Sequence, residues 1–484
     1  MSRRRAPLAL LGLIGSLLLA APARAEVMLH AFGWRYRLVE QRAAAIAAAG
    51  YKAVLVAPPH KSDRSGGCPW WRLYQPQDWR VIDNCAGDGV AFKAMVAALR
   101  RHDVRTVADV VLNHMANERD GATAFPGPVA LRAYAAEPRL WAARRLYGDL
   151  RVGQFSPQDF HPPFCIQGDD DPEAVRRGRL CGGAGDRGLP DLRASEAVGD
   201  WVSGQRRQLI EALYGLGVRG FRLDAAKHMP VAEIRAAVPE PIARNAHVFA
   251  ELISWGGAGE ASYGRFLEPY LRQLPASFGA YDFPLFHTLR HALRPAGSLT
   301  ALVDPTGQGQ ALEARRAVTV VVTHDIPANA GFQFLILDPI DEQLAYAYLL
   351  GRDGGTPLVF DDGSAERFER GRWVGAWQQG WLRRWIVFHN RMHGLPMAVL
   401  HADRCSLVWR RGPAADGAVM GVAAINKCAE VQELSVPSPR GRWRWQLLER
   451  NAQTPGLRIE ADQLRLRLGP RRALLWMGEG PGQP

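Results

Sequence analysis

Eight short runs of β-branched and aliphatic residues recur along the chain, and stretches rich in Ala, Leu and Arg separate most of them. Continuously apolar strands that alternate with helices are typical of a parallel sheet buried on both faces. The pattern therefore predicts a (β/α)8 TIM barrel. The predicted strands are Val27–Phe32, Ala53–Ala57, Thr106–Leu112, Gly220–Asp224, His247–Ala250, Phe278–Asp282, Val318–Val322 and Pro357–Phe360. The predicted helices include Leu38–Ala49, Val90–Arg101, Val202–Tyr214 and Glu342–Leu350.

Two regions depart from this alternation. Residues 115–190 are rich in Gly, Pro and Asp and too long for an ordinary βα loop, so we expect an inserted subdomain after strand three. From Met397 onward, short segments such as Gly417–Ile425 and Leu464–Leu468 predict a C-terminal antiparallel β-sandwich. The expected organisation is a signal peptide at 1–25, a barrel formed by 26–114 and 191–396, the insert at 115–190 and the sandwich at 397–484.

The start of the chain has the pattern of a secretory signal peptide. Three arginines, Arg3–Arg5, precede the apolar run Ala9–Ala21, and Ala23-Arg24-Ala25 forms a small-x-small cleavage site. The run is too short for a transmembrane helix. We therefore expect cleavage after Ala25 and a secreted protein, extracellular or periplasmic, that does not contact a membrane. A monomer is the default expectation.

The cysteine content agrees with export. An even number of cysteines, six, favours disulfides in an exported chain. Six cysteines allow 15 connectivities. Pairing of nearest neighbours is the simplest, and it would join Cys68 to Cys85, Cys165 to Cys181 and Cys405 to Cys428. No Cys/His spacing typical of zinc occurs.

The formal net charge of +12 raises the question of a nucleic-acid partner. The predicted signal peptide carries four arginines and no acidic residue, so its removal lowers the charge from +12 to +8. The remaining arginines are spread along the chain, and no basic run is interleaved with aromatic residues. We therefore expect no nucleic-acid partner.

Polar residues gather where the predicted strands end, which is the edge of a TIM barrel that carries active sites. Strand three ends in Asp109–His114, strand four in Gly220–His228, strand five in Phe249–Glu251 and strand seven in Val322–Asp325. A single Asp in such a place is most often a helix cap. Capping does not explain three carboxylates, Asp224, Glu251 and Asp325, on three different strands.

These segments resemble the four signature regions of the α-amylase family, glycoside hydrolase family 13. Leu189-Pro190-Asp191-Leu192 resembles a further segment of that family, and Cys68-Pro69-Trp70-Trp71 with Tyr74-Gln75-Pro76 resembles its aromatic stretch after strand two. The resemblance implies a secreted α-amylase that hydrolyses internal α-1,4 bonds of starch-like glucans with retention. An exo-acting maltooligosaccharide-forming amylase and a transglycosylase of the same family are alternatives, and a non-catalytic carbohydrate-binding relative is a third.

The resemblance also implies roles for individual residues. Asp224 would be the nucleophile, Glu251 the acid and base, and Asp325 the residue that holds the distorted sugar ring, while Arg222 would keep Asp224 ionised. An ordinary structural salt bridge is the alternative for Arg222. The remaining substrate-binding candidates, each of which could instead be structural, are Trp70, Trp71, Tyr74, His114, Lys227, His228 and His324.

The same resemblance implies a bound calcium ion. Calcium is a hard cation that prefers oxygen ligands, and the residues at the matching positions supply oxygens. The expected ligands are the Asn113 amide, the Asp191 carboxylate and the backbone carbonyls of Arg179 and His228. Chloride dependence is not expected, because Thr323 stands where chloride-activated members have Asn and Thr356-Pro357 stands where they have a basic residue.

Overall fold

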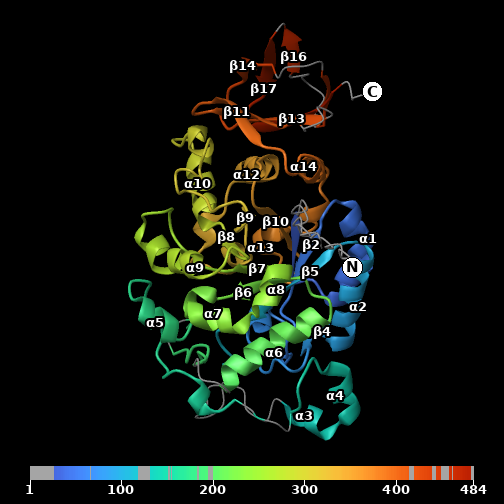
Figure 1. Ribbon diagram of the computed structural model, residues 1–484, viewed down its shortest axis with the longest axis vertical. Helices are drawn as coiled ribbons and strands as arrows, with labels where there is room; N and C mark the ends of the chain where they lie inside the picture. Colours follow the sequence, from blue (N-terminus) through green and yellow to red (C-terminus); the bar gives the residue numbers. More distant parts are fainter. Residues whose placement is uncertain are drawn as a thin grey trace, which may run out of the picture.

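The computed structural model describes residues 27–480, except 66, 118–130, 151–152, 154, 183–184, 195–199, 414–418, 439–442, 449–456 and 461. The predicted signal peptide lies outside the described residues. Eight parallel strands close a barrel in the order β1-β10-β9-β8-β7-β6-β5-β2 (Figure 1). They are β1 Met28–Phe32, β2 Ala53–Val56, β5 Arg105–Val111, β6 Gly220–Asp224, β7 His247–Ala250, β8 Phe278–Tyr281, β9 Ala317–Val320 and β10 Thr356–Asp362. The TIM-barrel prediction is confirmed, and no predicted strand end is wrong by more than two residues.

The barrel forms because its strands are apolar on both faces. Every residue of β1, β2, β6 and β8 is buried, so one face fills the barrel interior and the other packs against helices. The longer helices around the barrel are α1 Tyr36–Ala48, α2 Gly89–Arg101, α6 Trp201–Gly215, α10 Phe283–Leu293, α12 Pro339–Gly351 and α14 Gly380–Arg391. Shorter helices are α7 Val231–Ala237, α8 Glu240–Asn245, α9 Glu268–Gln273, α11 Asp325–Ala328 and α13 Phe368–Gly371.

A loop-rich insert separates β5 from α6. Its described helices are α3 Arg132–Ala136, α4 Pro138–Arg144, the 3-10 turn η3 Pro157–Asp159 and α5 Pro172–Arg177. A second departure from regular alternation lies between β2 and α2. It holds the 3-10 turn η1 (Trp70–Tyr74) and a short hairpin formed by β3 (Asp83–Asn84) and β4 (Gly87–Asp88).

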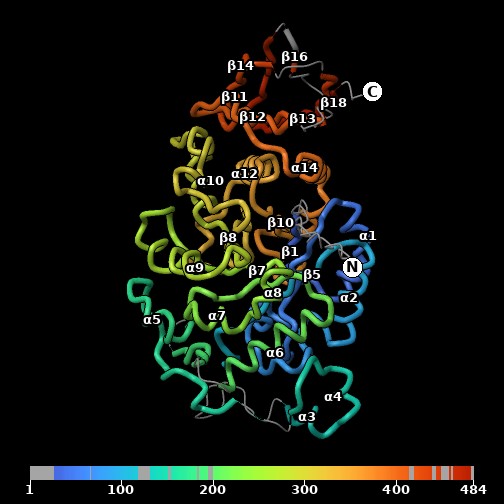
Figure 2. The backbone as a smooth tube through the Cα atoms, viewed as in Figure 1, coloured from blue at the N-terminus to red at the C-terminus, as the bar shows by residue number. Residues whose placement is uncertain are grey.

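Two antiparallel sheets follow the barrel, as the sequence predicts. One has the order β11-β12-β13-β18-β15 and the other the order β14-β17-β16. A shared apolar core that includes Val408, Leu464 and Trp476 lies between them. The backbone tube places these sheets at one end of the long axis and α3 and α4 at the other (Figure 2). The strands are β11 Met397–Ala402, β12 Ser406–Arg411, β13 Val419–Asn426, β14 Gln432–Pro437, β15 Arg444–Leu447, β16 Leu457–Glu460, β17 Gln463–Leu468 and β18 Arg472–Glu479.

The six cysteines form three disulfides between nearest neighbours in the sequence, Cys68–Cys85, Cys165–Cys181 and Cys405–Cys428. The simplest of the 15 connectivities is thus the one adopted. Among the helices of the described residues, none combines the length and the apolar character that crossing a bilayer requires.

Candidate active site

Neighbouring barrel strands bring the predicted catalytic groups together at their C-terminal ends. In the β5–β6 register Asp109 lies opposite Arg222, and in the β6–β7 register Arg222 lies opposite Phe249. Arg222 and Asp224 are two residues apart on β6, so their side chains point to the same side of the strand. Glu251 directly follows β7, and Asp325 begins α11 shortly after β9.

A single guanidinium group connects three of these carboxylates. Nη1 of Arg222 donates hydrogen bonds to Oδ1 of Asp109 at 2.8 Å and to Oδ1 of Asp224 at 2.6 Å. Nη2 of Arg222 forms an ion pair with Glu251. Arg222 is fully buried, and Asp224 and Glu251 are each only 7% exposed. The cluster is therefore shielded from water except at the mouth of the barrel.

The charges of the cluster do not balance, because four carboxyl groups surround one guanidinium. Burial raises the pKa of Asp109 and of Asp224 to about 7, against the opposing effect of Arg222. Burial also raises the pKa of Glu251 and of Asp325. The hydrogen bond between these two side chains raises the pKa of Glu251 and lowers that of Asp325. Of the groups around Arg222, Glu251 is thus one whose protonated form is favoured by burial and by the nearby Asp325 carboxylate, against the opposing effect of Arg222.

Aromatic rings form one wall beside the carboxylates. The His324 ring lies between Tyr74 and Phe32, with both ring centroids 4.9 Å from its own and interplanar angles of 12° and 17°. The Trp70 ring meets His324 edge-on at 5.8 Å. Burial lowers the pKa of His324 to about 3, so this imidazole is neutral. It can therefore serve as a hydrogen-bonding group but not as a cation.

Tyr74 connects this wall to the charged cluster. Its hydroxyl donates to Oδ2 of Asp109 at 3.0 Å, and its backbone carbonyl bonds Nε2 of His114 at 3.0 Å. Burial lowers the pKa of His114 to about 4. His114 is thus a second neutral histidine at the site.

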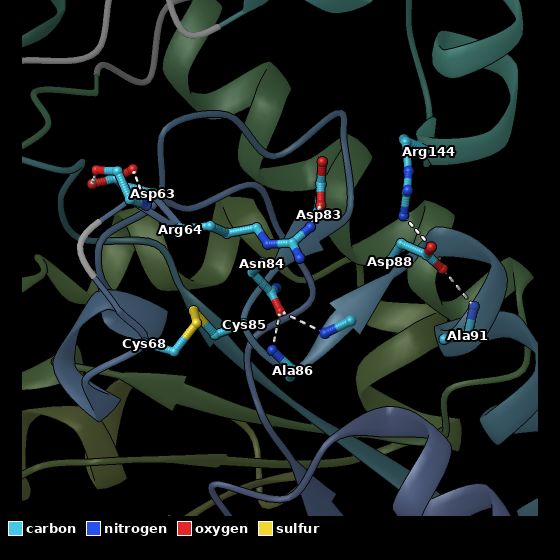
Figure 3. Close-up of polar contacts among 12 residues, drawn as sticks. Asp63, Arg64, Cys68, Asp83, Asn84, Cys85, Ala86, Asp88, Ala91 and Arg144 are labelled. Carbon is cyan, nitrogen blue, oxygen red and sulfur yellow. Dashed lines mark hydrogen bonds and ion pairs between the residues drawn. A yellow bond between two sulfur atoms is a disulfide. The ribbon is translucent and has the colours of Figure 1, made fainter. Parts of the chain in front are cut away.

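The segment that carries Trp70 and Tyr74 is held by local bonds (Figure 3). The Cys68–Cys85 disulfide ties its start to the β3–β4 hairpin. Within the hairpin, Oδ1 of Asn84 accepts hydrogen bonds from the backbone N–H groups of residues 86 and 87 at 2.8 and 3.3 Å. Asp88 caps α2 by accepting from the N–H of Ala91 at 2.8 Å.

Three predicted substrate-binding residues lie away from this wall. Trp71 is 38% exposed, and its ring lies under the guanidinium of Arg72, 5.3 Å from the ring centroid. Lys227 and His228 follow β6 in a short 3-10 turn and contact the insert. Nζ of Lys227 donates to Oδ2 of Asp169 at 2.5 Å, and Nδ1 of His228 bonds the carbonyl of Val175 at 3.0 Å.

The predicted metal ligands Asn113 and Asp191 meet where the insert returns to the barrel. Nδ2 of Asn113 donates to Oδ1 of Asp191 at 3.0 Å, and Nδ1 of His161 lies 2.6 Å from Oδ2 of the same carboxylate. Burial raises the pKa of Asp191 to about 6. A buried carboxylate beside an amide suits a hard cation if the amide turns its oxygen inward. The carbonyl of Arg179 accepts a hydrogen bond from the N–H of Ile166 at 3.1 Å.

The described residues hold no group of three or more His, Cys, Asp or Glu side chains that could bind a metal. A cation at Asn113 and Asp191 would therefore depend on backbone carbonyls for its remaining ligands. The donors are oxygens in every case, which fits calcium and does not fit zinc.

Four residues of this region carry little signal in the sequence. Asp109 lies in the third predicted strand, where a carboxylate inside an otherwise apolar strand is the available signal. Phe32 and His30 lie in the first strand and look like ordinary core residues there. His161 lies in the loop-rich insert, where no periodic pattern could have identified it.

A cavity of about 970 Å³ lies at the other end of the barrel, where Lys52, Arg105 and His247 stand at the N-terminal ends of strands. Lys52 pairs with Asp103 at 3.8 Å. None of the predicted site residues lines this cavity. The carboxylate cluster lies at the C-terminal end, as in other TIM-barrel enzymes.

Comparisons with known proteins agree with this geometry. No protein-family model matches the chain. An α-amylase of Aeromonas hydrophila is 42% identical over 464 residues, which cover 95% of this chain and 97% of that protein. A crystal structure of α-amylase I from Eisenia fetida has a TM-score of 0.71 at 21% identity, over 94% of this chain and 97% of that one. A Geobacillus thermoleovorans α-amylase solved with acarbose has a TM-score of 0.65 at 16% identity, over 95% of this chain and 100% of that one.

The Aeromonas relative is similar along nearly the whole chain, and the solved structures match the fold of this chain over most of its length. The chain therefore belongs to the α-amylase family of glycoside hydrolases.

Proposed function

We propose that this α-amylase cleaves internal α-1,4 bonds of starch-like glucans with retention of configuration. The observation that supports the proposal most directly is the cluster around Arg222. It places one carboxylate, Asp224, 2.6 Å from a fixed positive charge, and a second, Glu251, where burial and the nearby Asp325 carboxylate raise its pKa. Retaining glycosidases need such a pair, with one group ionised and the other protonated.

In the first step, an oxygen of Asp224 attacks the anomeric carbon while the bond to the leaving glucan breaks. Arg222 keeps Asp224 ionised for this attack and opposes the effect of burial on its pKa. Glu251 gives its proton to the departing oxygen, so the leaving group departs as a neutral hydroxyl. The product of this step is a glycosyl ester of Asp224.

In the second step, Glu251 acts as a base. Its carboxylate takes a proton from a water molecule, and the water oxygen attacks the anomeric carbon and displaces Asp224. The cycle ends with Asp224 ionised and Glu251 protonated, as at the start. Two displacements on one carbon give net retention.

The aromatic wall would position the sugar for both steps. Tyr74 offers a flat face against a pyranose ring, while His114 and His324, both neutral, can exchange hydrogen bonds with its hydroxyls. Asp325 would hold ring hydroxyls on the other side. Trp70, whose ring meets His324, would contact an adjoining sugar.

A calcium ion would bind Asn113 and Asp191 with the carbonyls of Arg179 and His228. When bound, it supplies a positive charge that fixes the insert to the barrel. This role agrees with the burial of the Asp191 carboxylate, which raises its pKa to about 6.

We also infer that the protein is exported. The signal-peptide pattern at 1–25 and the three disulfides support this inference, because disulfides persist in oxidising compartments.

The decisive experiment uses a maltoheptaoside blocked at its non-reducing end and carrying a chromogenic group at the other. Cleavage of this substrate, together with rapid loss of starch viscosity, is the expected result for an internal-acting enzyme. Degradation of starch without cleavage of the blocked substrate would show exo action instead. Proton NMR of the first products, taken before mutarotation, is expected to show the α-anomer. A β-anomer would overturn the retaining mechanism.

A further inference from the structure

Two exposed aromatic rings lie together on the side of the barrel mouth away from Tyr74. Trp255 is in the loop after β7, and Phe334 is in the 3-10 turn η7 (Gln333–Leu335) after β9. Their rings stack at 6.1 Å with an interplanar angle of 13°. Trp255 is 38% exposed and Phe334 is 65% exposed. A pair of large apolar rings facing solvent marks a site of interaction more often than a structural feature.

The barrel order places this pair, which we call the Trp255–Phe334 platform, on the side of the mouth opposite the segment that carries Trp70 and Tyr74. The loops after β7 and β9 flank β8, and β8 is four strands from β2 in either direction around the closed barrel. Tyr74 belongs to the segment after β2. Tyr74 and the platform therefore belong to opposite sides of the barrel mouth.

Trp255 lies close to one member of the catalytic cluster. Trp255 and Asp325 line the same small crevice, together with Thr323 and with apolar side chains of α10 and of the segment after β9. Glu251 lies only four residues before Trp255 in the same loop. Because Glu251 would protonate the leaving oxygen, the leaving part of the glucan begins beside Glu251, and Trp255 belongs to the loop that Glu251 begins.

Bonds to α10 hold the platform in place. Nε2 of His287 bonds the carbonyl of Ser254 at 3.0 Å, and the His287 ring lies 5.0 Å from that of Trp255. Nη2 of Arg290 donates to the carbonyl of Phe334 at 3.0 Å. Both rings are thus presented by anchored backbone, which reduces the entropy lost when a ligand stacks on them.

We propose that the Trp255–Phe334 platform binds a glucose unit on the leaving-group side of the scissile bond and so determines the length of the released product. The proposal rests on the proposed function, because it takes the direction of the glucan from the role of Glu251. A pyranose fits this surface, since its flat apolar face stacks on aromatic rings while its hydroxyls remain in water.

The test compares two substrates. One carries a single chromogenic group as its whole leaving group, and the other carries three further glucose units there. In Trp255→Ala and Phe334→Ala, kcat/KM for the long substrate relative to the short one is expected to fall about tenfold. Trp255→Phe, which keeps a flat ring, is expected to restore most of the ratio. Digests of maltoheptaose would show cleavage moving toward the reducing end.

The matched control is Trp443→Ala, because Trp443 and Trp445 form a ring pair at 6.2 Å in the C-terminal sheets. Trp443→Ala is expected to leave kcat/KM unchanged for both the long and the short substrate. In Trp255→Ala and Phe334→Ala, an unchanged ratio of kcat/KM between the long and the short substrate would overturn the proposed role of the platform. An equal loss of kcat/KM on both substrates would do the same. Failure of the wild-type protein to cleave either substrate would instead contradict the proposed function. Thermal melts of each variant separate a folding defect from a binding defect.

Discussion

Removing the charge of Asp109 is the most direct test of how the carboxylates around Arg222 affect one another. It is 1% exposed, and its carboxylate bonds Arg222 and the hydroxyl of Tyr74 behind Asp224. In Asp109→Asn, the amide oxygen can still accept from Arg222, and the Tyr74 hydroxyl can rotate to accept from the amide nitrogen. The substitution thus removes a negative charge while keeping the shape of the site.

The expected shift in the pKa of Asp224 follows from the Arg222 Nη1 atom, which donates hydrogen bonds to both Asp109 and Asp224. Oδ1 of Asp109 lies 2.8 Å and Oδ1 of Asp224 lies 2.6 Å from the same Nη1 atom, so these two oxygens are at most 5.4 Å apart. At an effective dielectric constant of about 20, two charges at this distance repel by about 3 kcal/mol, or about 2 pKa units. Because the pKa of Asp109 is itself about 7, only part of this repulsion acts at neutral pH. We expect the pKa of Asp224 to fall by about 1 unit.

The assay is the pH dependence of kcat/KM, whose acid limb reports the group that must be ionised in the free enzyme. Activity needs ionised Asp224, so kcat/KM falls as the pH drops through the pKa of Asp224, about 7 in the native protein. Asp109→Asn should therefore move the acid limb to lower pH. The control is Asp282→Asn, which removes an equally buried carboxylate whose bonds go to the N–H groups of Leu285 and Leu312. An acid limb that stays in place or moves to higher pH in Asp109→Asn would refute the reasoning.

Three further outcomes are expected. Asp224→Asn and Glu251→Gln should each abolish hydrolysis while the circular dichroism spectrum stays native, and a loss of less than about tenfold would contradict the assigned roles. Thorough chelation should lower the melting temperature of the native protein, because a ligand bound only to the folded state stabilises it, but should leave that of Asp191→Ala unchanged. An equal response of both proteins would contradict the calcium site. Replacing Cys68 and Cys85 by Ser should lower the free energy of unfolding by about 3 kcal/mol, since the disulfide closes a loop with a sequence separation of 17. Urea denaturation measures this change, and unaltered stability would show that the loop is already constrained in the unfolded chain.

The sequence by itself determined the barrel and the places of its strands, and it predicted that three carboxylates meet at one edge of the barrel. Hydrophobic periodicity is a local property, and it located strands such as Gly220–Asp224 and His247–Ala250 to the residue. The ends of parallel strands meet at one edge, so residues at those ends could be assigned to one site before any contact was known. Glu251 and Asp325 were found in this way.

Only the tertiary structure decided how these groups affect one another. The bonds of Arg222 to Asp109, Asp224 and Glu251 join three strands, and the raised pKa of Glu251 follows from burial and from the nearby charge of Asp325. Likewise, β7 and β9 lie on the two sides of β8, and the loops that follow them bring the rings of Trp255 and Phe334 into contact. The physical reason is that pKa values and ring contacts depend on distance and dielectric environment in three dimensions, whereas strand periodicity depends only on neighbours along the chain.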